Sequence, residues 1–291
     1  MTRRFKRVAW FAATCTYLLI VLGAIVRITG SGLGCGEHWP LCNGRLLPLL
    51  DLPTLIEYGH RLAAAAVSVL VGTLAAYAWW LRHRPPPSST ALHRPGVGAY
   101  VALGLLIVQV LLGAVTVKLQ LPPWTVILHL GTAMLLLATL LVVAKRAPLT
   151  PGASPGNTGA GSTPGSRPGL VGTIAVALGF VTVLFGALTA NLGAASACLG
   201  FPLCNGAFIP AGNYLQHVHW THRLLAYALA GYVVWWALRT KRLGTWYVVG
   251  LVALQVAVAA AMILLGLPRL LQATHVAVGA AVWAGLVLAV W

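Results

Sequence analysis

Long apolar runs recur along the chain and are separated by short polar stretches. A membrane-spanning helix needs about 20 consecutive apolar residues, and eight runs reach that length. They cover residues 8–28, 56–81, 96–117, 125–144, 170–190, 217–238, 244–266 and 270–290. Lipid offers the backbone no hydrogen-bond partner, so only helices and closed barrels cross it, and these runs lack the alternation of barrel strands. The pattern predicts an all-α membrane protein with eight transmembrane helices.

The two halves of the chain resemble each other. The pentapeptide PLCNG occurs at 40–44 and again at 202–206, a spacing of 162 residues. The same spacing, followed by one of 146 residues further along, relates polar residues within the spans. These pairs are His60 and His222, Arg61 and Arg223, Gln109 and Gln255, and His129 and His275. Because a repeat of four spans keeps both copies in one orientation, we expect two tandem, pseudo-symmetric four-helix bundles.

The stretch 145–169 separates the two copies. It is rich in Pro, Gly, Ser and Thr and has no apolar periodicity. Such a composition cannot bury enough apolar surface to fold, so we expect a disordered cytoplasmic linker between an N-terminal bundle, 1–144, and a C-terminal bundle, 170–291. The first span is too long for a signal peptide and lacks a convincing cleavage site, so we interpret it as a retained helix.

The distribution of basic residues indicates a membrane topology. The net charge is +16, yet only 8% of the residues are charged and 59% are hydrophobic. Thirteen of the 19 basic residues precede span one or join spans two to three, four to five and six to seven, all on one side of the membrane. The positive-inside rule makes that side cytoplasmic. We therefore expect a multi-pass cell-membrane protein surrounded by lipid, with both termini cytoplasmic and no nucleic-acid partner.

Four histidines occupy matching depths in the two halves. His60 and His129 lie a few residues inside the outer ends of spans two and four, and His222 and His275 repeat this on spans six and eight. Bundles commonly hold cofactors on side chains of facing helices, and two neutral imidazoles ligate haem iron. A single intramembrane histidine often only hydrogen-bonds a neighbouring helix, but two matched pairs favour haem. Zinc would need further ligands, and copper would favour sulfur ligands.

Arg61 and Arg223 each directly follow one of these histidines. A guanidinium suits carboxylates well, so we expect the two arginines to contact haem propionates. The alternative is that each arginine only extends from the helix end toward water.

Four of the five cysteines form two pairs in outer loops. Cys35 and Cys42 lie between spans one and two, and Cys198 and Cys204 between spans five and six. Disulfides persist on the outer, oxidising side of a membrane. We therefore expect the bridges Cys35–Cys42 and Cys198–Cys204, which would staple the loops above the haem pockets or take part in redox chemistry.

Taken together, these features resemble the bacterial type of haem A synthase. The resemblance is carried by eight spans, by CGEHWPLCNG and EYGHR in the first half, by HWTHR in the second, and by the lone histidines of spans four and eight. It covers nearly the whole chain apart from the linker. It implies an enzyme that oxidises the C8 methyl of haem O to a formyl group, giving haem A for terminal oxidases.

The resemblance also implies roles for the two halves. The N-terminal half would hold the substrate haem O on His60 and His129, and the C-terminal half would hold a resident haem b on His222 and His275. A haem O synthase is a plausible partner, because the insoluble substrate would be passed on within the membrane. The electron acceptor, for example a quinone, is open.

Glu57 lies one helical turn before His60 and matches the family's essential acid. Residues three or four apart share one helix face, so Glu57 would lie beside the substrate, where a carboxylate accepts protons or orients water. The second copy has His219 at this position, which fits one reactive half and one electron-carrying half. The alternative is an acid that is merely favourable at a helix start.

Two other functions use part of this pattern. A di-haem b-type cytochrome that only transfers electrons needs the four histidines but neither Glu57 nor the asymmetry at His219. A secondary transporter built from repeats needs helices broken near the membrane centre, whereas these spans are continuous and their polar residues cluster near one surface.

Overall fold

The computed structural model describes residues 2–46, 51–83, 96–146 and 169–291. Within these ranges the chain forms eight long helices and one short 3₁₀ helix, with no β-strand. In chain order the helices are α1 (Thr2–Ile28), α2 (Leu52–His83), α3 (Val97–Lys118), α4 (Pro123–Arg146), α5 (Leu170–Asn191), η1 (Ala194–Ala197), α6 (Tyr214–Thr240), α7 (Leu243–Leu264) and α8 (Arg269–Val290). The expected helices are therefore present, extended by a few residues at some ends.

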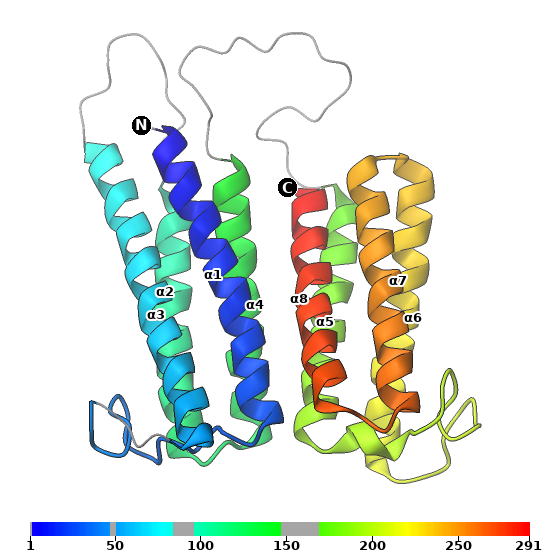
Figure 1. Ribbon diagram of the computed structural model, residues 1–291. Coiled ribbons are helices and arrows are strands. Elements are labelled where there is room, and N and C mark those ends of the chain that lie inside the picture. The colour runs from blue at the N-terminus through cyan, green and yellow to red at the C-terminus, as the bar shows by residue number, and fades with distance from the viewer. Residues whose placement is uncertain (1, 47–50, 84–95, 147–168) are drawn as a thin grey trace.

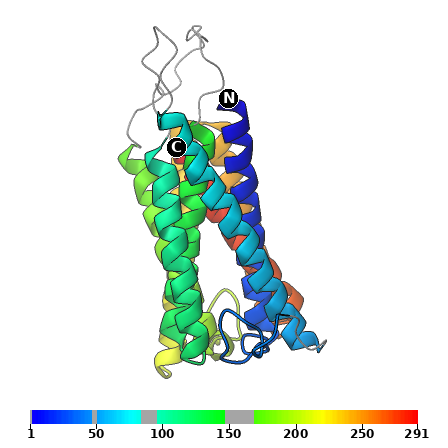
Figure 2. The ribbon, with the colours of Figure 1, turned by 90° about the vertical axis from the view of Figure 1, so that its left-hand side faces the viewer.

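Seven of the eight long helices are long and apolar enough to cross a membrane, and α6 is not among them. The first three turns of α6 contain a glutamine, three histidines and Arg223, which lower its average hydropathy. Figures 1 and 2 show α6 running side by side with the other helices, with the two termini at the same end of the molecule. The prediction of eight spans is thus confirmed for seven, and the crossing by α6 stays a prediction.

Each half of the molecule packs its four helices as a ring. In the first half α1 contacts α2 and α4, and α3 contacts α2 and α4, while α2 and α4 make no substantial contact with each other. In the second half α5 and α7 separate α6 from α8 in the same way. The four predicted histidine ligands lie on the two helices of each half that stay apart. The repeat symmetry and the domain bounds themselves stay predictions, and most of the expected linker lies outside the described residues.

The two halves join through α1 and α4 of the first and α5 and α8 of the second. Buried apolar side chains fill this seam, and three side-chain hydrogen bonds cross it, one of them from the ammonium group of Lys145 to the carbonyl of Leu288. The indole Nε1–H of Trp283 donates to the carbonyl of Met134 at 2.8 Å, and the hydroxyl of Tyr17 donates to the carbonyl of Ala277 at 3.0 Å. Small residues on α1, including Ala9, Ala12 and Ala13, let neighbouring helices approach α1 closely.

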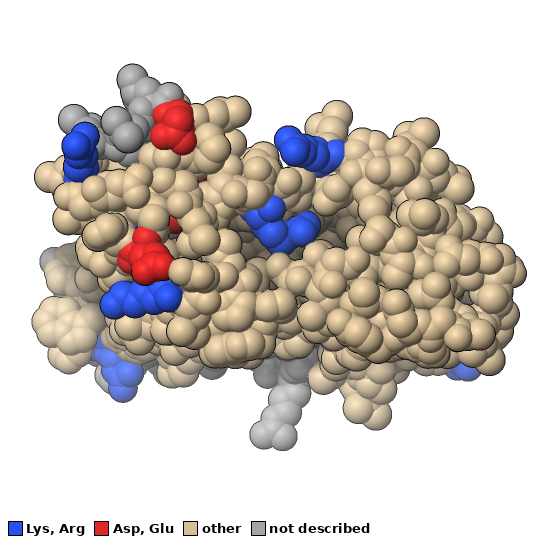
Figure 3. All heavy atoms as spheres, turned by 90° about the horizontal axis from the view of Figure 1, so that it is seen from below, with Lys and Arg blue, Asp and Glu red and all other residues tan. Residues whose placement is uncertain are grey.

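The end of the molecule opposite the termini carries both cysteine loops, and we call it the disulfide end. Cys35 is bonded to Cys42, and Cys198 to Cys204, so both predicted bridges are confirmed. All three acidic residues of the chain, Glu37, Asp51 and Glu57, lie at this end in the first half. Figure 3 accordingly shows acidic side chains over only one half of this face. The charge distribution thus differs between two halves of similar architecture.

Asp51 marks the start of α2 at the disulfide end. Its carboxylate accepts hydrogen bonds from the backbone N–H of Thr54 at 3.2 Å and from the Thr54 hydroxyl at 2.9 Å. These bonds satisfy a free N–H of the first turn and hold the pKa of Asp51 below its usual value. The Thr54 hydroxyl also donates to the carbonyl of Gly34 at 2.8 Å, which fastens the first cysteine loop to α2.

Candidate haem-binding and catalytic site

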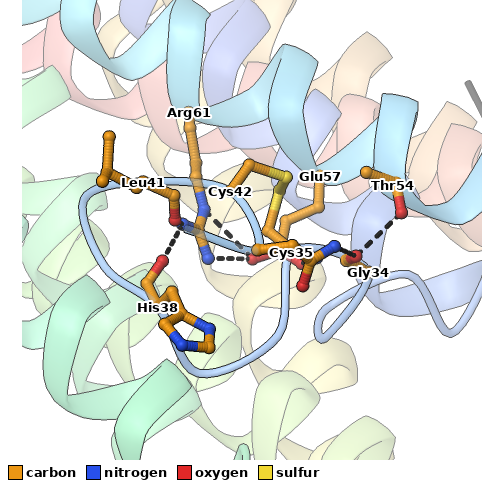
Figure 4. A network of polar contacts seen from close by, with 9 residues as sticks. Gly34, Cys35, His38, Leu41, Cys42, Thr54, Glu57 and Arg61 are labelled. Carbon is orange, nitrogen blue, oxygen red and sulfur yellow. Dashed lines mark hydrogen bonds and ion pairs between the residues drawn. A yellow bond between two sulfur atoms is a disulfide. The ribbon is translucent and has the colours of Figure 1, made fainter. Parts of the chain in front are cut away.

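Glu57 and Arg61 form an ion pair one turn apart on α2. The shortest distance, from Nη2 of Arg61 to Oε1 of Glu57, is 2.6 Å, and the Arg61 Nε–H donates to the same oxygen at 3.1 Å. The other carboxylate oxygen accepts the backbone N–H of Cys35 at 2.7 Å. Glu57 is only 3% exposed. Figure 4 shows that the pair lies directly against the cysteine loop.

Arg61 also binds the backbone of the loop. Its Nη1 donates to the carbonyls of His38 and Leu41 at 2.9 and 2.8 Å (Figure 4). Every nitrogen of this guanidinium therefore has a protein partner. The structure shows Arg61 holding the cysteine loop, and its contact with a propionate stays a prediction.

Arg223 does the same in the second half, without an acidic partner. Its Nη1 donates to the carbonyls of Gly200 and Leu203 at 2.7 and 2.9 Å, and its Nη2 donates to the carbonyl of Cys198 at 2.7 Å. His219, which replaces Glu57, is 5% exposed, and its Nδ1 lies 3.1 Å from the carbonyl of Ala194. The first half thus pairs its half-buried Arg61 with a carboxylate, whereas no acidic side chain pairs with the buried Arg223 of the second half.

The four predicted ligands lie in pairs on the opposite helices of each ring. His60 on α2 is paired with His129 on α4, and His222 on α6 with His275 on α8. The Nδ1 atoms of His60, His129 and His222 are buried and have no hydrogen-bond partner among the described residues. A buried nitrogen without a partner is costly unless a ligand satisfies it.

Glycines on neighbouring helices make room for three of these imidazoles. A Cβ added at Gly23 of α1 or at Gly113 of α3 would lie 3.2 Å from the Cε1 of His60 or His129, respectively. A Cβ at Gly186 of α5 would lie 2.9 Å from the Cε1 of His222. A side chain at these positions would push the ring away, so the three glycines set where the imidazoles lie.

Two glutamines contact ring nitrogens of His129 and His275. The Gln109 amide nitrogen lies 3.1 Å from Nε2 of His129, and that of Gln255 lies 3.2 and 3.3 Å from the two ring nitrogens of His275. The amide oxygens of both glutamines are buried without a partner. Sequence reasoning used Gln109 and Gln255 only to align the repeats and missed this role, although their equivalent positions opposite the histidines were the available signal.

Comparison with known proteins agrees with the geometry. The family model COX15-CtaA, described as cytochrome oxidase assembly protein, matches residues 6–287. A protein of Symbiobacterium thermophilum named Heme A synthase is 33% identical over 95% of this chain and 92% of its own length. Heme A synthases of Shouchella clausii and Bacillus pumilus are 31% and 35% identical, over 72% and 45% of this chain and 67% and 41% of their own lengths.

Proposed function

Because this chain belongs to the COX15-CtaA family of cytochrome oxidase assembly proteins, we propose that it is a haem A synthase, which converts the C8 methyl group of haem O to a formyl group. The observation that carries the proposal is the set of buried imidazole nitrogens without partners on helices that do not touch each other. The relatives named Heme A synthase support this reaction over a di-haem cytochrome that only transfers electrons.

The donor sets of both halves fit a haem. Neutral imidazoles from two facing helices are common axial ligands of haem iron in bundles. In this proposal His60 and His129 hold the substrate, haem O, and His222 and His275 hold a resident haem b. The bound haem b supplies the electron-transfer chemistry that amino-acid side chains lack. Gln109 and Gln255 orient the imidazoles beside them, and the three glycines keep the rings in place.

Glu57 is the group that accepts protons, or holds water, in the N-terminal half. With water as the source of the oxygen and a membrane acceptor taking the electrons, conversion of a methyl to a formyl group removes four electrons from that carbon and releases four protons. An ionised carboxylate offers about four acceptor positions, and three N–H groups from Cys35 and Arg61 occupy three of them. The remaining position accepts a proton or a water molecule. The two hydrogen bonds from Arg61 fix the orientation of the carboxylate.

The orientation in the membrane follows from the charges. The terminal end carries most of the basic residues and faces the cytoplasm of a bacterial cell, and the disulfide end faces outward, where disulfides persist. Haem O reaches the N-terminal bundle through the lipid, handed over by a haem O synthase. Electrons from the oxidation leave through the C-terminal bundle to a membrane acceptor such as a quinone.

The test is to express the full chain with a source of haem O and to identify the extracted haems by mass. We expect haem A from the wild type, only haem O from His60→Ala, and loss of haem b from His222→Ala. Unchanged haem O in the wild type would instead favour the electron-transferring cytochrome.

Glu57→Gln separates catalysis from binding. The variant is expected to bind haem O and to make at least tenfold less haem A, because an amide cannot accept a proton. Glu37→Gln, which changes an exposed acid in the neighbouring cysteine loop, is the matched control and should convert normally. Haem A at the wild-type level from Glu57→Gln would remove this carboxylate from the mechanism.

A further inference from the structure

Arg27, in the last turn of α1 at the disulfide end, is a partly buried cation whose side chain has no hydrogen bond or ion pair with any described residue. The three acids of the chain are all engaged elsewhere. Glu57 pairs with Arg61, Glu37 accepts a hydrogen bond from the Gln120 amide at 2.6 Å, and Asp51 binds Thr54. The chain therefore offers Arg27 no carboxylate.

A cation in the last turn of a helix is favoured by the helix dipole, and a cation near a membrane surface often extends toward water. Neither effect gives the guanidinium a hydrogen-bond partner. The side chain of Arg27 is partly buried and unpaired among the described residues, so it is free to pair with an anionic group that the protein itself does not provide.

Arg27 lies on the helix face that contacts the substrate-side histidine. Gly23 is one turn earlier on α1, and residues four apart share a face. Gly23 packs against the imidazole of His60, with 3.2 Å from an added Cβ to the ring. Side chains lean toward the N-terminus of their helix, so the side chain of Arg27 covers the turn that contains Gly23. The cation therefore lies on the face of α1 that meets His60, one turn closer to the disulfide end.

The second half has no equivalent of this cation on α5. Gly186 packs against His222 as Gly23 packs against His60, but one turn later α5 has Ala190 where α1 has Arg27. The difference lies in the half that must recognise and release a substrate, whereas the other half keeps its haem.

We propose that Arg27 binds a propionate carboxylate of the substrate tetrapyrrole in the N-terminal bundle. This inference rests on the proposed function and names the substrate group that the bundle recognises. A bidentate pair between the guanidinium of Arg27 and a propionate carboxylate orients the macrocycle, so that the same edge always faces Glu57. The nitrogens of Arg61 are already bonded to Glu57 and the loop, whereas those of Arg27 have no partner among the described residues.

The experiment compares two probes that differ only in charge. The full-length protein, purified with its resident haem, is titrated with ferric protoporphyrin IX and with its dimethyl ester, and binding is followed by the Soret band. The relevant site is the one that His60→Ala abolishes. We expect the wild type to bind the free acid about 10- to 100-fold more tightly than the ester, the range for loss of a charge-assisted hydrogen bond.

In Arg27→Gln the free acid should bind only as tightly as the ester, while the affinity of the ester stays within about twofold of wild type. Arg27→Lys should retain part of the preference. Arg269→Gln, an exposed cation of the second half, is the matched control and should bind both probes like the wild type. An unchanged Soret band of the resident haem in each variant shows that the fold is intact.

Two results overturn the inference, and they are distinguishable. If Arg27→Gln keeps the full preference for the free acid, Arg27 does not bind a propionate, and a lipid phosphate is its anion instead, while the haem site at His60 stands. If the wild type shows no site that depends on His60, the proposed function fails together with the inference.

Discussion

The substitution Gly186→Ala tests the placement of His222 most directly. The added methyl carbon would lie 2.9 Å from Cε1 of the His222 ring and 3.5 Å from each ring nitrogen. Carbon atoms in contact are normally about 3.5–4.0 Å apart, so the imidazole must move by about 0.6–1.1 Å. The helix itself gains, because Ala is about 1 kcal/mol more favourable than Gly in a helix interior. The variant should therefore fold and misplace one side chain.

The expected consequence is weaker binding of haem b. Overpacking of a well-packed site costs about 1–3 kcal/mol, which corresponds to a roughly 5- to 150-fold loss of affinity. The assay is the amount of haem b per purified protein by pyridine haemochrome, together with the reduction potential of the bound haem. Gly231→Ala on α6 is the matched control, because an added Cβ there meets nothing within 4 Å.

Full haem b content with an unchanged potential in Gly186→Ala would refute the reasoning, because the ring of His222 would then not depend on the space beside Gly186. Beside the fourth histidine, His275, the sequence has alanine where the other three histidines have glycine. Where the repeat spacing places the counterpart of Gly113, α7 has Ala259. The surroundings of His275 therefore tolerate a methyl group that those of His222 do not.

Two further substitutions test the contacts that hold the loops and the halves. Arg223→Lys loses the two-pronged donation of the guanidinium to the carbonyls of the second cysteine loop. Amide hydrogen exchange at residues 198–207 should then accelerate about 10- to 100-fold, the effect of about 1.5–3 kcal/mol. Exchange as slow as in the wild type would show that Arg223 does not hold the loop. Trp283→Phe removes the indole donor that reaches the carbonyl of Met134 across the seam and should destabilise the protein to denaturant by about 0.5–1.5 kcal/mol. Trp246→Phe, at a 43% exposed indole, should change little, and equal stability of the two variants would count against the hydrogen bond across the seam.

The sequence alone determined the helical secondary structure, and it predicted the membrane topology and the candidate ligands, which stay predictions. Helices in lipid follow from run length and composition, which are local properties, and this explains why the expected spans match the observed helices. The exception is α6, which forms a helix but is not apolar enough to count as a membrane span, because its first turns carry histidines, a glutamine and an arginine. The repeat also identified His60, His129, His222 and His275, because equal spacing in two copies places equivalent residues at equivalent depths. The disulfide pairs followed from their place in outer loops.

The tertiary structure decided which groups meet. Sequence spacing predicted that Glu57, His60 and Arg61 share one region of α2. Only the fold shows that Arg61 forms an ion pair with Glu57 and hydrogen bonds with carbonyls of the loop. The glycines beside the imidazoles and the absence of an acid near Arg27 likewise depend on helices that are distant along the chain. Such contacts arise from the relative rotation and approach of packed helices. A one-dimensional pattern does not contain this information, since every residue on one face of a helix has the same periodicity whichever neighbour it touches.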